Sequence, residues 1–563
     1  MGRFNLIDEP WISVVVDEMG QTEEISLKSL FENAHIYKCI AGDTKAQDFA
    51  VLRVLLAILH TVFSRFDAHG EPYIFFDLDE QYKPTSSIED EEDLEDYTDA
   101  LYQTWKDLWL AGQFPEIINE YLEKWRDRFY LLDEEYPFFQ VTKNDLYSRN
   151  ITVLGKQNRP PTKIEAKKIN GLITESNKVV LFSPKYNDGK NIITETELTR
   201  WLITYQGYSN TSDKADFTEN KNEKSFGWLY SLGGLFFEGR NLFETLLLNT
   251  ILVYPDDETI KKQQRPCWEF SGKEIIDNSI KGRQPDNLSE LYTNWGRAIY
   301  VDPEFDGKSP LTTIEVVKLS KIDVRQKFAE PMTIWKFNES GPNKDTFTPR
   351  KHQVNQSIWR SFGLLSLPSS YVSQQRQPGI IDWMNDIASL IGDYDLTLCA
   401  ISMKDDGNAT SWVPVDEATD QLSINDLILT DIKESGWVPR ISDAVEETKE
   451  IIKSTYRRRF LMEIKKIRNI DSKSFVDEEV EKLYFQINAP FSRWLSELRP
   501  SDSKDNRIFE WSKTLKTIVL RQAEQFVKNA GPRDYTGIVD EGKTKNIATI
   551  YNSFIYSLNQ QLK

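Results

Sequence analysis

The chain has 563 residues, enough for two or more domains and a large hydrophobic core. Hydrophobic residues make up 39% of it and aromatic residues 12%, so the composition is that of a globular protein and excludes an intrinsically disordered one. There are 69 basic and 88 acidic residues. The resulting net charge of −19 argues against a free-standing nucleic-acid binder, which is usually basic.

Cysteine usage and the apolar segments bear on the compartment of the protein. The three cysteines lie far apart and form no CxxC pair: Cys39, Cys267 and Cys399. We therefore expect no disulfide framework and no cysteine zinc site, and a reducing compartment fits. The N-terminus has no basic region followed by an apolar one, so no signal peptide is expected. The longest apolar segment, residues 49–63, contains Arg53 and His60 and predicts a buried helix rather than a membrane span. A cytoplasmic protein is expected.

The first part of the chain predicts a helical core with short strands. Residues 4–15 predict an N-terminal hairpin, two strands joined by a polar turn at Pro10. Residues 46–66 carry large apolar side chains at helical spacing and predict the central helix of the first domain. Residues 73–78 have strand composition. The acidic run 89–99 is interpreted as the solvated start of a helix, where carboxylates suit the positive end of the macrodipole, rather than as a metal site or a DNA mimic.

The middle of the chain is less regular. Polar, basic and short β-rich runs mix over residues 140–194, and residues 207–224 form a second long polar stretch. Such long loops are usually disordered or functional. Further strands are expected at 299–301, 312–319, 332–336 and 396–403. Residues 404–411 predict a hairpin turn with an Asp-Gly signal. Helices and strands do not alternate regularly, so residues 1–420 predict a large mixed α/β N-terminal domain in an α+β fold.

After about residue 420 the pattern changes to long amphipathic helices. They are expected at 442–468, 474–498, 507–529 and 545–562. Four helices of this length with short connections predict a C-terminal four-helix bundle over residues 421–563. The densest basic patch of the chain lies on the first helix: Arg457, Arg458 and Arg459. Two interpretations of this patch stay open, a solvated helix face and a contact to phosphate or to a partner.

The sequence shows no motif of an enzymatic site. The four histidines form no HExxH, HD or HxH spacing, and there is no GxSxG, Walker motif or cysteine cluster. We therefore expect no catalytic residues, no metal and no cofactor, and an interaction protein rather than an enzyme. Two alternatives stay open: a purely structural scaffold subunit, and a stand-alone metal-dependent nuclease built from distant carboxylates.

Several stretches resemble one known family in their order and spacing. The first is Phe4-Asn5-Leu6-Ile7-Asp8-Glu9-Pro10-Trp11-Ile12-Ser13-Val14-Val15, in which only Ser13 departs from the opening signature of that family. The later stretches are Tyr136–Gln140, Leu242–Asn249, Asp323–Phe328 and Pro331–Trp335. In these stretches the chain resembles the CasA family, the large subunit of the type I-E CRISPR Cascade surveillance complex. Some relatives carry a cysteine-rich zinc-binding insertion, whose cysteines this chain lacks.

The resemblance implies a non-catalytic subunit at one end of Cascade. CasA-like subunits recognise the protospacer-adjacent motif (PAM) in duplex DNA, help open the duplex for crRNA pairing and recruit the helicase-nuclease. The implied partners are the other Cascade subunits, the crRNA 5′ handle, double-stranded target DNA and the helicase-nuclease effector, with no membrane. An acidic subunit can bind DNA through a local basic groove when partner subunits supply most phosphate contacts.

The resemblance also implies roles for individual residues near two turns. The stretch Arg325–Phe328 is similar to the part of the family that holds the PAM-contacting lysine, which makes Lys327 the matching residue. A hairpin that enters the duplex beside the PAM resembles residues 405–410. There Asn408 matches the amide-bearing tip, and Gly407 allows close backbone approach.

Two longer loops complete the implied site. The family's flexible loop near the crRNA handle resembles residues 182–191. Its candidate residues are Phe182, Ser183, Lys185 and Lys190, with the two lysines as phosphate contacts. The glycine-rich minor-groove loop of some relatives has no clear match. In its place, residues 206–224 offer hydrogen-bond donors: Ser209, Asn210, Ser212 and Lys214. This departure leaves the PAM sequence undetermined.

Overall fold

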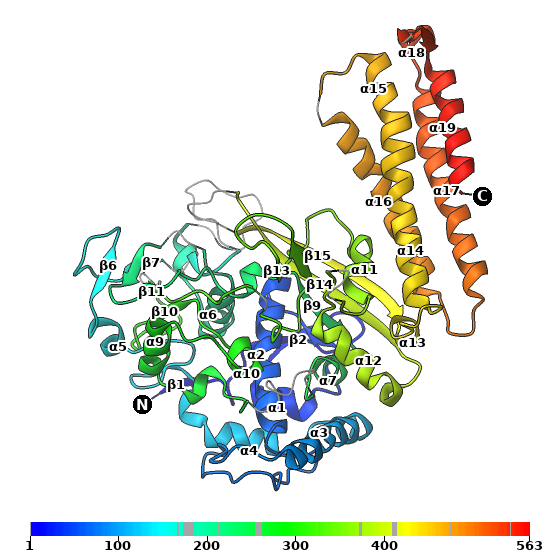
Figure 1. Ribbon diagram of the computed structural model, residues 1–563. Helices are drawn as coiled ribbons and strands as arrows, with labels where there is room; N and C mark the ends of the chain where they lie inside the picture. The colour runs from blue at the N-terminus through cyan, green and yellow to red at the C-terminus, as the bar shows by residue number, and fades with distance from the viewer. Residues whose placement is uncertain are drawn as a thin grey trace. The chain divides into compact units, whose positions relative to one another are not determined.

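The structure is a computed structural model. It describes the chain except for residues 1, 166–167, 173–184, 186, 211–212, 254–261, 312–313, 326, 371–373, 408–413, 473, 541 and 563 (Figure 1). The chain divides into two compact units. Unit 1 comprises Met1–Asn355, Pro378–Leu390 and Cys399–Asp420, and unit 2 comprises Gln356–Gln377, Ile391–Leu398 and Gln421–Lys563. Helices and strands are mixed, which confirms the α+β class. Unit 2 includes two short segments that lie before residue 420 in the sequence.

Unit 1 is built from helices of different lengths around a central helix, α2. Its helices are α1 (Leu27–Asn33), α2 (Lys45–Phe63), α3 (Glu91–Ala111), α4 (Ile117–Lys124), α5 (Lys143–Tyr147), α6 (Glu195–Tyr208), α7 (Leu242–Leu248), α9 (Gly272–Lys281), α10 (Leu288–Tyr292) and α12 (Gly379–Ile391). Short 3-10 turns lie at Arg126–Arg128, Asn187–Asn191, Leu229–Ser231 and Cys267–Glu269.

The strands of unit 1 form several small sheets rather than one large one. One two-stranded sheet contains β1 (Arg3–Asn5) and β5 (Tyr130–Leu132), and another contains β12 (Trp335–Asn338) and β13 (Thr346–Pro349). A three-stranded sheet has the order β3 (Thr22–Ile25), β2 (Ile12–Val15), β4 (Cys39–Ile40). A larger sheet has the order β10 (Arg297–Tyr300), β11 (Ile314–Lys318), β8 (Ala215–Phe217), β6 (Ile151–Val153), with β7 (Thr162–Ile164) also on β11. A last sheet has the order β15 (Pro414–Asn425), β14 (Asp395–Asp405), β9 (Gly234–Glu238).

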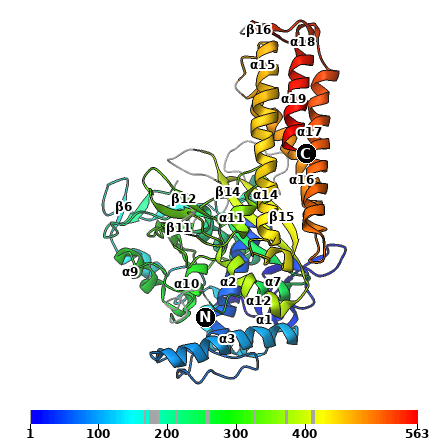
Figure 2. The same ribbon diagram turned by 45° about the vertical axis from the view of Figure 1, so that its right-hand side comes forward.

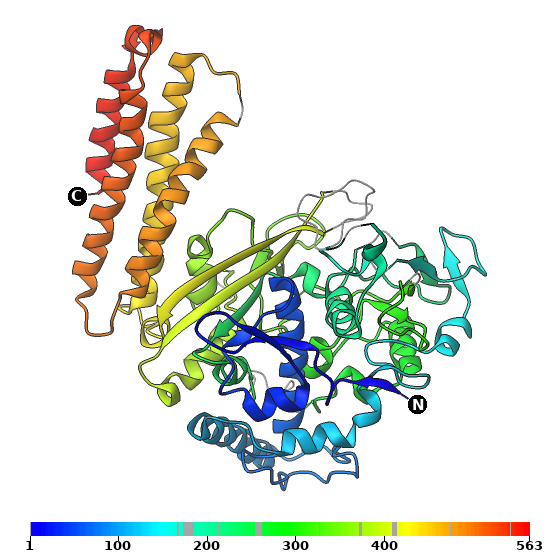
Figure 3. The ribbon, with the colours of Figure 1, turned by 180° about the vertical axis from the view of Figure 1, so that it is seen from behind.

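Helix α2 lies at the centre of unit 1, as the view from behind shows (Figure 3). Thr44 caps its N-terminus, accepting a hydrogen bond from the Gln47 N–H at 3.2 Å. By length and composition the helix is apolar enough to cross a membrane, but its side chains are buried among α4, α6, α7 and α10. A helix that is apolar all round belongs in a core. The predicted central helix is thus confirmed.

The N-terminal hairpin is not formed, and that prediction was wrong. β1 pairs with β5, whereas β2 pairs with β3 and β4. The chain turns sharply between the strands, because the Asn5 side chain accepts the Ile7 N–H and the Asn5 carbonyl accepts the Glu9 N–H, at 3.0 and 2.8 Å.

Residues 73–78 form turns and an isolated bridge at Leu78 instead of the predicted strand. Three aromatic rings of this segment, Tyr73, Phe75 and Phe76, instead pack against Tyr97 of α3.

The helices of unit 2 are long. They are α14 (Trp437–Glu450), a π-helical segment (Ile451–Leu461), α15 (Met462–Arg468), α16 (Phe475–Ser496), α17 (Lys504–Lys528) and α19 (Ile547–Gln561). Shorter elements accompany them: a 3-10 turn (Ile358–Ser361), α11 (Phe362–Ser366), α13 (Asp426–Leu429), α18 (Pro532–Thr536), β16 (Ile538–Asp540) and β17 (Lys543–Lys545). α17 packs against α14, α16 and α19, and the π-helical segment packs against α16 and α19 (Figure 2).

The π-helical segment has an unusual burial pattern. Its buried side chains come in adjacent pairs: Ile451 with Ile452, Thr455 with Tyr456, and Phe460 with Leu461. The pairs recur about every four and a half residues, a wider spacing than the 3.6 of an α-helix. A helix with i→i+5 bonds keeps all three pairs on one side, against α16 and α19. The apolar pattern therefore favours the wider helix at this place.

Candidate nucleic-acid interface

Lys327 lies in the connection between β11 and β12. Its side chain is half-buried, and its ammonium donates a hydrogen bond to the carbonyl of Pro285. Burial lowers the pKa of Lys327, although the nearby carboxylates of Asp286 and Glu290 act in the opposite direction. The lysine is therefore not an open strand-edge cation. It must exchange an internal contact to reach a phosphate or a base.

The connection that carries Lys327 is held to the protein core by Glu330. The Glu330 carboxylate forms a bidentate ion pair with Arg53 of α2, with N–O distances of 2.8 and 2.7 Å, and both side chains are 0% exposed. The same carboxylate accepts hydrogen bonds from Trp228 Nε1 at 2.6 Å and from the Met332 N–H at 3.1 Å. Four donors thus satisfy one buried carboxylate and fix the loop against α2.

A second buried ion pair holds the segment after α6. The Arg297 guanidinium, 0% exposed, binds the Asp213 carboxylate with N–O distances of 2.8 and 3.0 Å. It also donates to the carbonyls of Asn210 and Ser225. Arg297 lies on β10 opposite Lys318 of β11, so the segment is anchored directly on the larger sheet.

This anchoring conflicts with two predicted donors. Ser209 is 0% exposed and Asn210 is 8% exposed. The Ser209 hydroxyl has no hydrogen-bond partner among the described residues, but it faces the protein interior rather than a groove. Neither side chain can reach DNA in this conformation, because the contacts of Arg297 draw the segment inward. Lys214 is half-buried, and its backbone N–H donates to Thr162 Oγ1 at 3.4 Å. Ser212 lies outside the described residues.

The predicted hairpin is formed by β14 and β15. Gly407 has a φ of +71°, a left-handed conformation that glycine adopts without strain and that suits the Asp-Gly turn signal. The Gly407 N–H donates to Asp405 Oδ1 at 2.9 Å. Asp405 in turn lies 3.7 Å from the Lys351 ammonium. Asn408, the predicted tip, lies outside the described residues.

The loop before α6 contains the two predicted phosphate-contacting lysines. Lys185 pairs with Glu197 at 2.6 Å and donates to the Ile192 carbonyl at 2.8 Å. Lys190 is half-buried in the 3-10 turn that follows. The charge of Lys185 is therefore compensated by Glu197. Phe182 and Ser183 lie outside the described residues.

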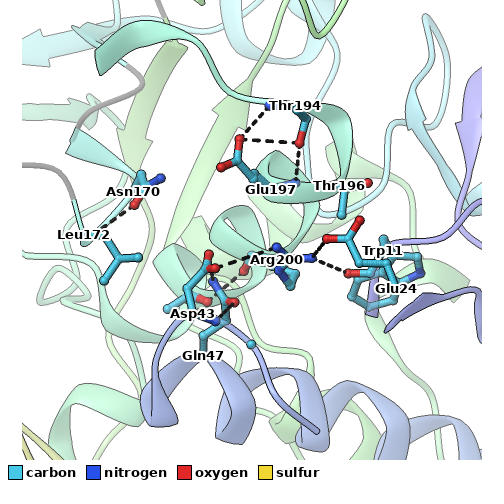
Figure 4. Close-up of polar contacts among 12 residues, drawn as sticks. Trp11, Glu24, Asp43, Gln47, Asn170, Leu172, Thr194, Thr196, Glu197 and Arg200 are labelled. Carbon is cyan, nitrogen blue, oxygen red and sulfur yellow. Dashed lines mark hydrogen bonds and ion pairs between the residues drawn. The ribbon is translucent and has the colours of Figure 1, made fainter. Parts of the chain in front are cut away.

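Helix α6 connects this loop to the N-terminal stretch. Figure 4 shows Arg200 with Glu24 and Trp11 on one side and Asp43 on the other. Its guanidinium donates to the Trp11 carbonyl and to Glu24, each at 2.9 Å. Figure 4 also shows the capping box at the start of α6, in which Glu197 accepts the Thr194 N–H at 2.9 Å. Glu197 thus has two roles, because it caps helix α6 and also neutralises the charge of Lys185.

The arginines of the predicted basic patch lie on the π-helical segment of unit 2. Arg457 pairs with Asp477 of α16 at 2.8 Å, and Arg459 donates to Ser557 of α19 at 3.2 Å. Arg458 is exposed. Part of the patch therefore links helices within unit 2, and Arg458 is the residue best placed to meet a phosphate or a partner.

Sequence reasoning missed the buried anchors of the loops, Glu330 and Asp213. One signal was present: Arg53 interrupts an apolar helix, and a buried guanidinium requires a carboxylate partner. Nothing in the sequence pattern indicates which carboxylate that is. In the part of the chain that the structure describes, no three His, Cys, Asp or Glu side chains are grouped to hold a metal ion.

Comparison with known proteins gives consistent matches. The family model described as CRISPR-associated protein Cse1 matches residues 5–522. CRISPR-associated protein CasA/Cse1 of Thermus thermophilus is 26% identical over 309 residues, 54% of this chain and 50% of that protein, so the match spans half the length of the curated relative. The crystal structure of Thermobifida fusca Cse1 has a TM-score of 0.77 at 22% identity, covering 100% of this chain and 98% of that one. A chain of a structure titled CRISPR RNA-guided surveillance complex has a TM-score of 0.66 at 15% identity, covering 99% of each chain.

Proposed function

Since the chain belongs to the family of CRISPR-associated protein Cse1, we propose that it is the non-catalytic large subunit of a type I-E CRISPR Cascade complex. In this role it recognises the PAM in duplex DNA, helps open the duplex for crRNA pairing and recruits the helicase-nuclease. Its partners are the other Cascade subunits and the crRNA 5′ handle, in the cytoplasm. The family match over residues 5–522 is the observation that carries this proposal.

The anchoring of the candidate loops supports the proposal. Glu330 fixes the connection that carries Lys327, and Asp213 fixes the segment after α6. Asp405, which pairs with Lys351, lies at the end of β14, where the turn to β15 begins. Groups that read DNA must be held in place on a rigid scaffold. In the minor groove the base pattern is degenerate, so recognition there tolerates several PAMs. A hairpin wedge that unstacks a base step works against a cost of a few kcal/mol, which also requires a firm base.

Charge distribution refines the predicted contacts. Lys185 is paired with Glu197, so a phosphate must displace this carboxylate to reach it, and Lys185 and Lys190 both remain the proposed phosphate contacts of this loop. Because Ser209 is buried, Lys214 is the best remaining hydrogen-bond donor of the segment after α6. We also propose that the four long helical stretches of unit 2 act as a four-helix bundle that docks a neighbouring subunit, with Arg458 at the contact.

The proposal is tested by target binding of the reconstituted crRNA complex with and without this subunit. Duplex targets carry either a functional or a scrambled PAM. We expect affinity and R-loop formation to depend on both the subunit and the PAM. If the complex binds equally well without the subunit, the scaffold alternative is favoured. Metal-dependent cleavage by the purified chain, lost on mutation of a carboxylate, favours the nuclease alternative.

Lys327→Ala tests the predicted PAM contact directly. We expect the variant to bind a functional PAM about tenfold more weakly, because one good base contact contributes roughly 1–3 kcal/mol of discrimination. Binding to a scrambled PAM should change much less. The matched control is Lys344→Ala, which removes an exposed lysine in the β12–β13 turn. Equal losses for the two variants on both targets contradict the assignment of Lys327.

A further inference from the structure

Lys351 lies beneath the β14–β15 hairpin on a rigid part of the backbone. The Arg350 N–H donates to the Ile334 carbonyl at 2.8 Å, and the His352 N–H donates to Ser402 Oγ at 2.9 Å. Gly233 approaches this segment so closely that a Cβ there would lie 2.0 Å from the Arg350 carbonyl oxygen. Arg350 is thus fixed to Ile334 and His352 to β14, so the side chain of Lys351 starts from a defined position.

The Lys351 ammonium makes three contacts at the point where β14 ends. It donates to the Met403 carbonyl at 3.1 Å and lies 3.7 Å from Asp405 Oδ2. It also lies 3.8 Å from the ring centroid of Tyr230, a cation–π distance. The Tyr230 hydroxyl hydrogen-bonds the Asp405 carboxylate, and Oδ1 of that carboxylate accepts the Gly407 N–H at 2.9 Å. One cation therefore contacts the strand backbone, the carboxylate that shapes the turn and the ring beside it.

We propose that Lys351 is a positioning residue that sets the direction in which the β14–β15 hairpin leaves the sheet, and thereby sets the rate of duplex opening without contributing to PAM affinity. The proposal rests on the function proposed above, in which this hairpin is the wedge. Lys351 contacts Met403, Asp405 and Tyr230, so we infer that its effect on DNA is exerted through Asp405 and Gly407.

The charge of Lys351 offers a readout that a purely structural role does not move. Burial lowers the pKa of Lys351 from its ordinary value of 10.5 to about 8, and the Asp405 carboxylate opposes this effect. The other titratable groups at the contact are Tyr230, whose pKa is raised by burial and by Asp405, and Asp406, which acts on Tyr230. Above pH 8 the ammonium loses its proton, and Asp405 loses its cation.

Global stability should change in the opposite direction over this pH range. The lysine of the unfolded chain keeps its proton up to about pH 10.5, so between pH 8 and 10.5 the unfolded state binds more protons than the folded state. The contribution of Lys351 to the free energy of unfolding therefore rises with pH. A fall in duplex opening in this window is then a local effect of the hairpin and not the result of unfolding.

The experiment measures R-loop formation by the full complex on two targets. One is an intact duplex with a functional PAM, and the other has the base pairs next to the PAM already unpaired. We expect Lys351→Met to slow opening of the intact duplex about tenfold, the usual size of a lost hydrogen bond to a charged group, and to leave the unpaired target unaffected. Lys336→Met, an exposed lysine of β12, is the matched control and should behave as wild type on both targets.

Two further variants complete the test. Lys351→Arg keeps a cation at every pH used, so it should restore opening and abolish the decline that wild type shows between pH 7 and 9. Tyr230→Phe keeps the ring and removes the hydroxyl, and should slow opening by a smaller factor. Thermal unfolding of each variant identifies any that fails to fold. If Lys351→Met fails to fold, the opening rate of Lys351→Arg and its pH profile test the role of Lys351 instead.

The results separate this proposal from the proposed function. Equal slowing on both targets, wild-type opening by Lys351→Met, or a pH profile that Lys351→Arg leaves unchanged would each overturn the role of Lys351. If removal of the whole wild-type subunit leaves opening of the intact duplex unchanged, the proposed function itself fails.

Discussion

Replacement of Glu330 by Gln tests whether the buried ion pair with Arg53 holds the Lys327 connection to the core. Both side chains are 0% exposed, and the carboxylate accepts four hydrogen bonds through two oxygens. A glutamine amide offers one oxygen and one NH2 group. In Glu330→Gln the NH2 group must therefore face donors such as Trp228 Nε1 or the Met332 N–H, and Arg53 is left as an uncompensated buried cation.

The magnitude follows from the burial. Removal of one partner of a buried, hydrogen-bonded ion pair costs about 3–5 kcal/mol, most of it the penalty of the charge left behind. We expect this fall in the free energy of unfolding for Glu330→Gln, measured by urea unfolding followed by tryptophan fluorescence. The double variant Arg53→Met/Glu330→Gln removes the orphaned cation, so it should be less destabilised than the single variant by about 1 kcal/mol or more.

A matched surface pair provides the control. Glu123 pairs with Arg126 at 2.6 Å but is 43% exposed. Exposed ion pairs typically contribute less than about 1 kcal/mol, so Glu123→Gln should leave the unfolding midpoint almost unchanged. Hydrogen exchange adds a local measurement, and protection of residues 319–334 should fall in Glu330→Gln. A loss below 1 kcal/mol for Glu330→Gln, or additive losses in the double variant, would refute the reasoning.

Two further predictions concern buried groups of unit 1. His60 is fully buried, with Nδ1 2.6 Å from the Leu56 carbonyl and Nε2 accepting the Ile251 N–H at 3.1 Å, and burial lowers its pKa from 6.5 to about 4. Between these two pKa values the unfolded state binds more protons than the folded state, so the free energy of unfolding should fall by about 3 kcal/mol as the pH falls from 6.5 to 4. In His60→Gln the midpoint of urea unfolding should therefore depend less on pH over this range. Asp213→Asn breaks the ion pair with Arg297, and should lower stability by about 3 kcal/mol and deprotect residues 209–214 in hydrogen exchange. Unchanged protection of that segment would contradict the anchoring role.

Local patterns were sufficient for the long helices. The apolar spacing of residues 46–66 is a property of one segment, and α2 forms where it predicts. The helix predicted from residue 442 begins earlier, at Trp437, because Pro439 falls in the first turn, where its missing N–H has no cost. The π-helical segment was not predicted, although its paired apolar residues carry the signal in their spacing.

Long-range pairings could not be predicted in the same way. β1 pairs with β5 more than 100 residues later, so its partner is set by the whole fold and not by the adjacent turn. The same holds for the carboxylate partners of Arg53 and Arg297. Burial of Ser209 follows from one such pairing, since a polar segment looks solvent-exposed in the sequence until an arginine from a distant strand draws it inward. The exposure of site residues such as Ser209 therefore could not be predicted where tertiary contacts, rather than composition, determine it.

The same contacts explain how an acidic chain can serve DNA recognition. Lys185 is neutralised by Glu197, Lys351 by Asp405, and Lys327 is held by a backbone carbonyl. When Lys185 or Lys327 moves to a phosphate, it exchanges one partner for another, so the net gain per contact is small. Added to a net charge of −19, this predicts weak DNA binding by the isolated chain. In the function proposed above, the chain binds DNA firmly only when partner subunits supply the remaining phosphate contacts, so we expect its own contribution to be selectivity among duplexes rather than affinity for them.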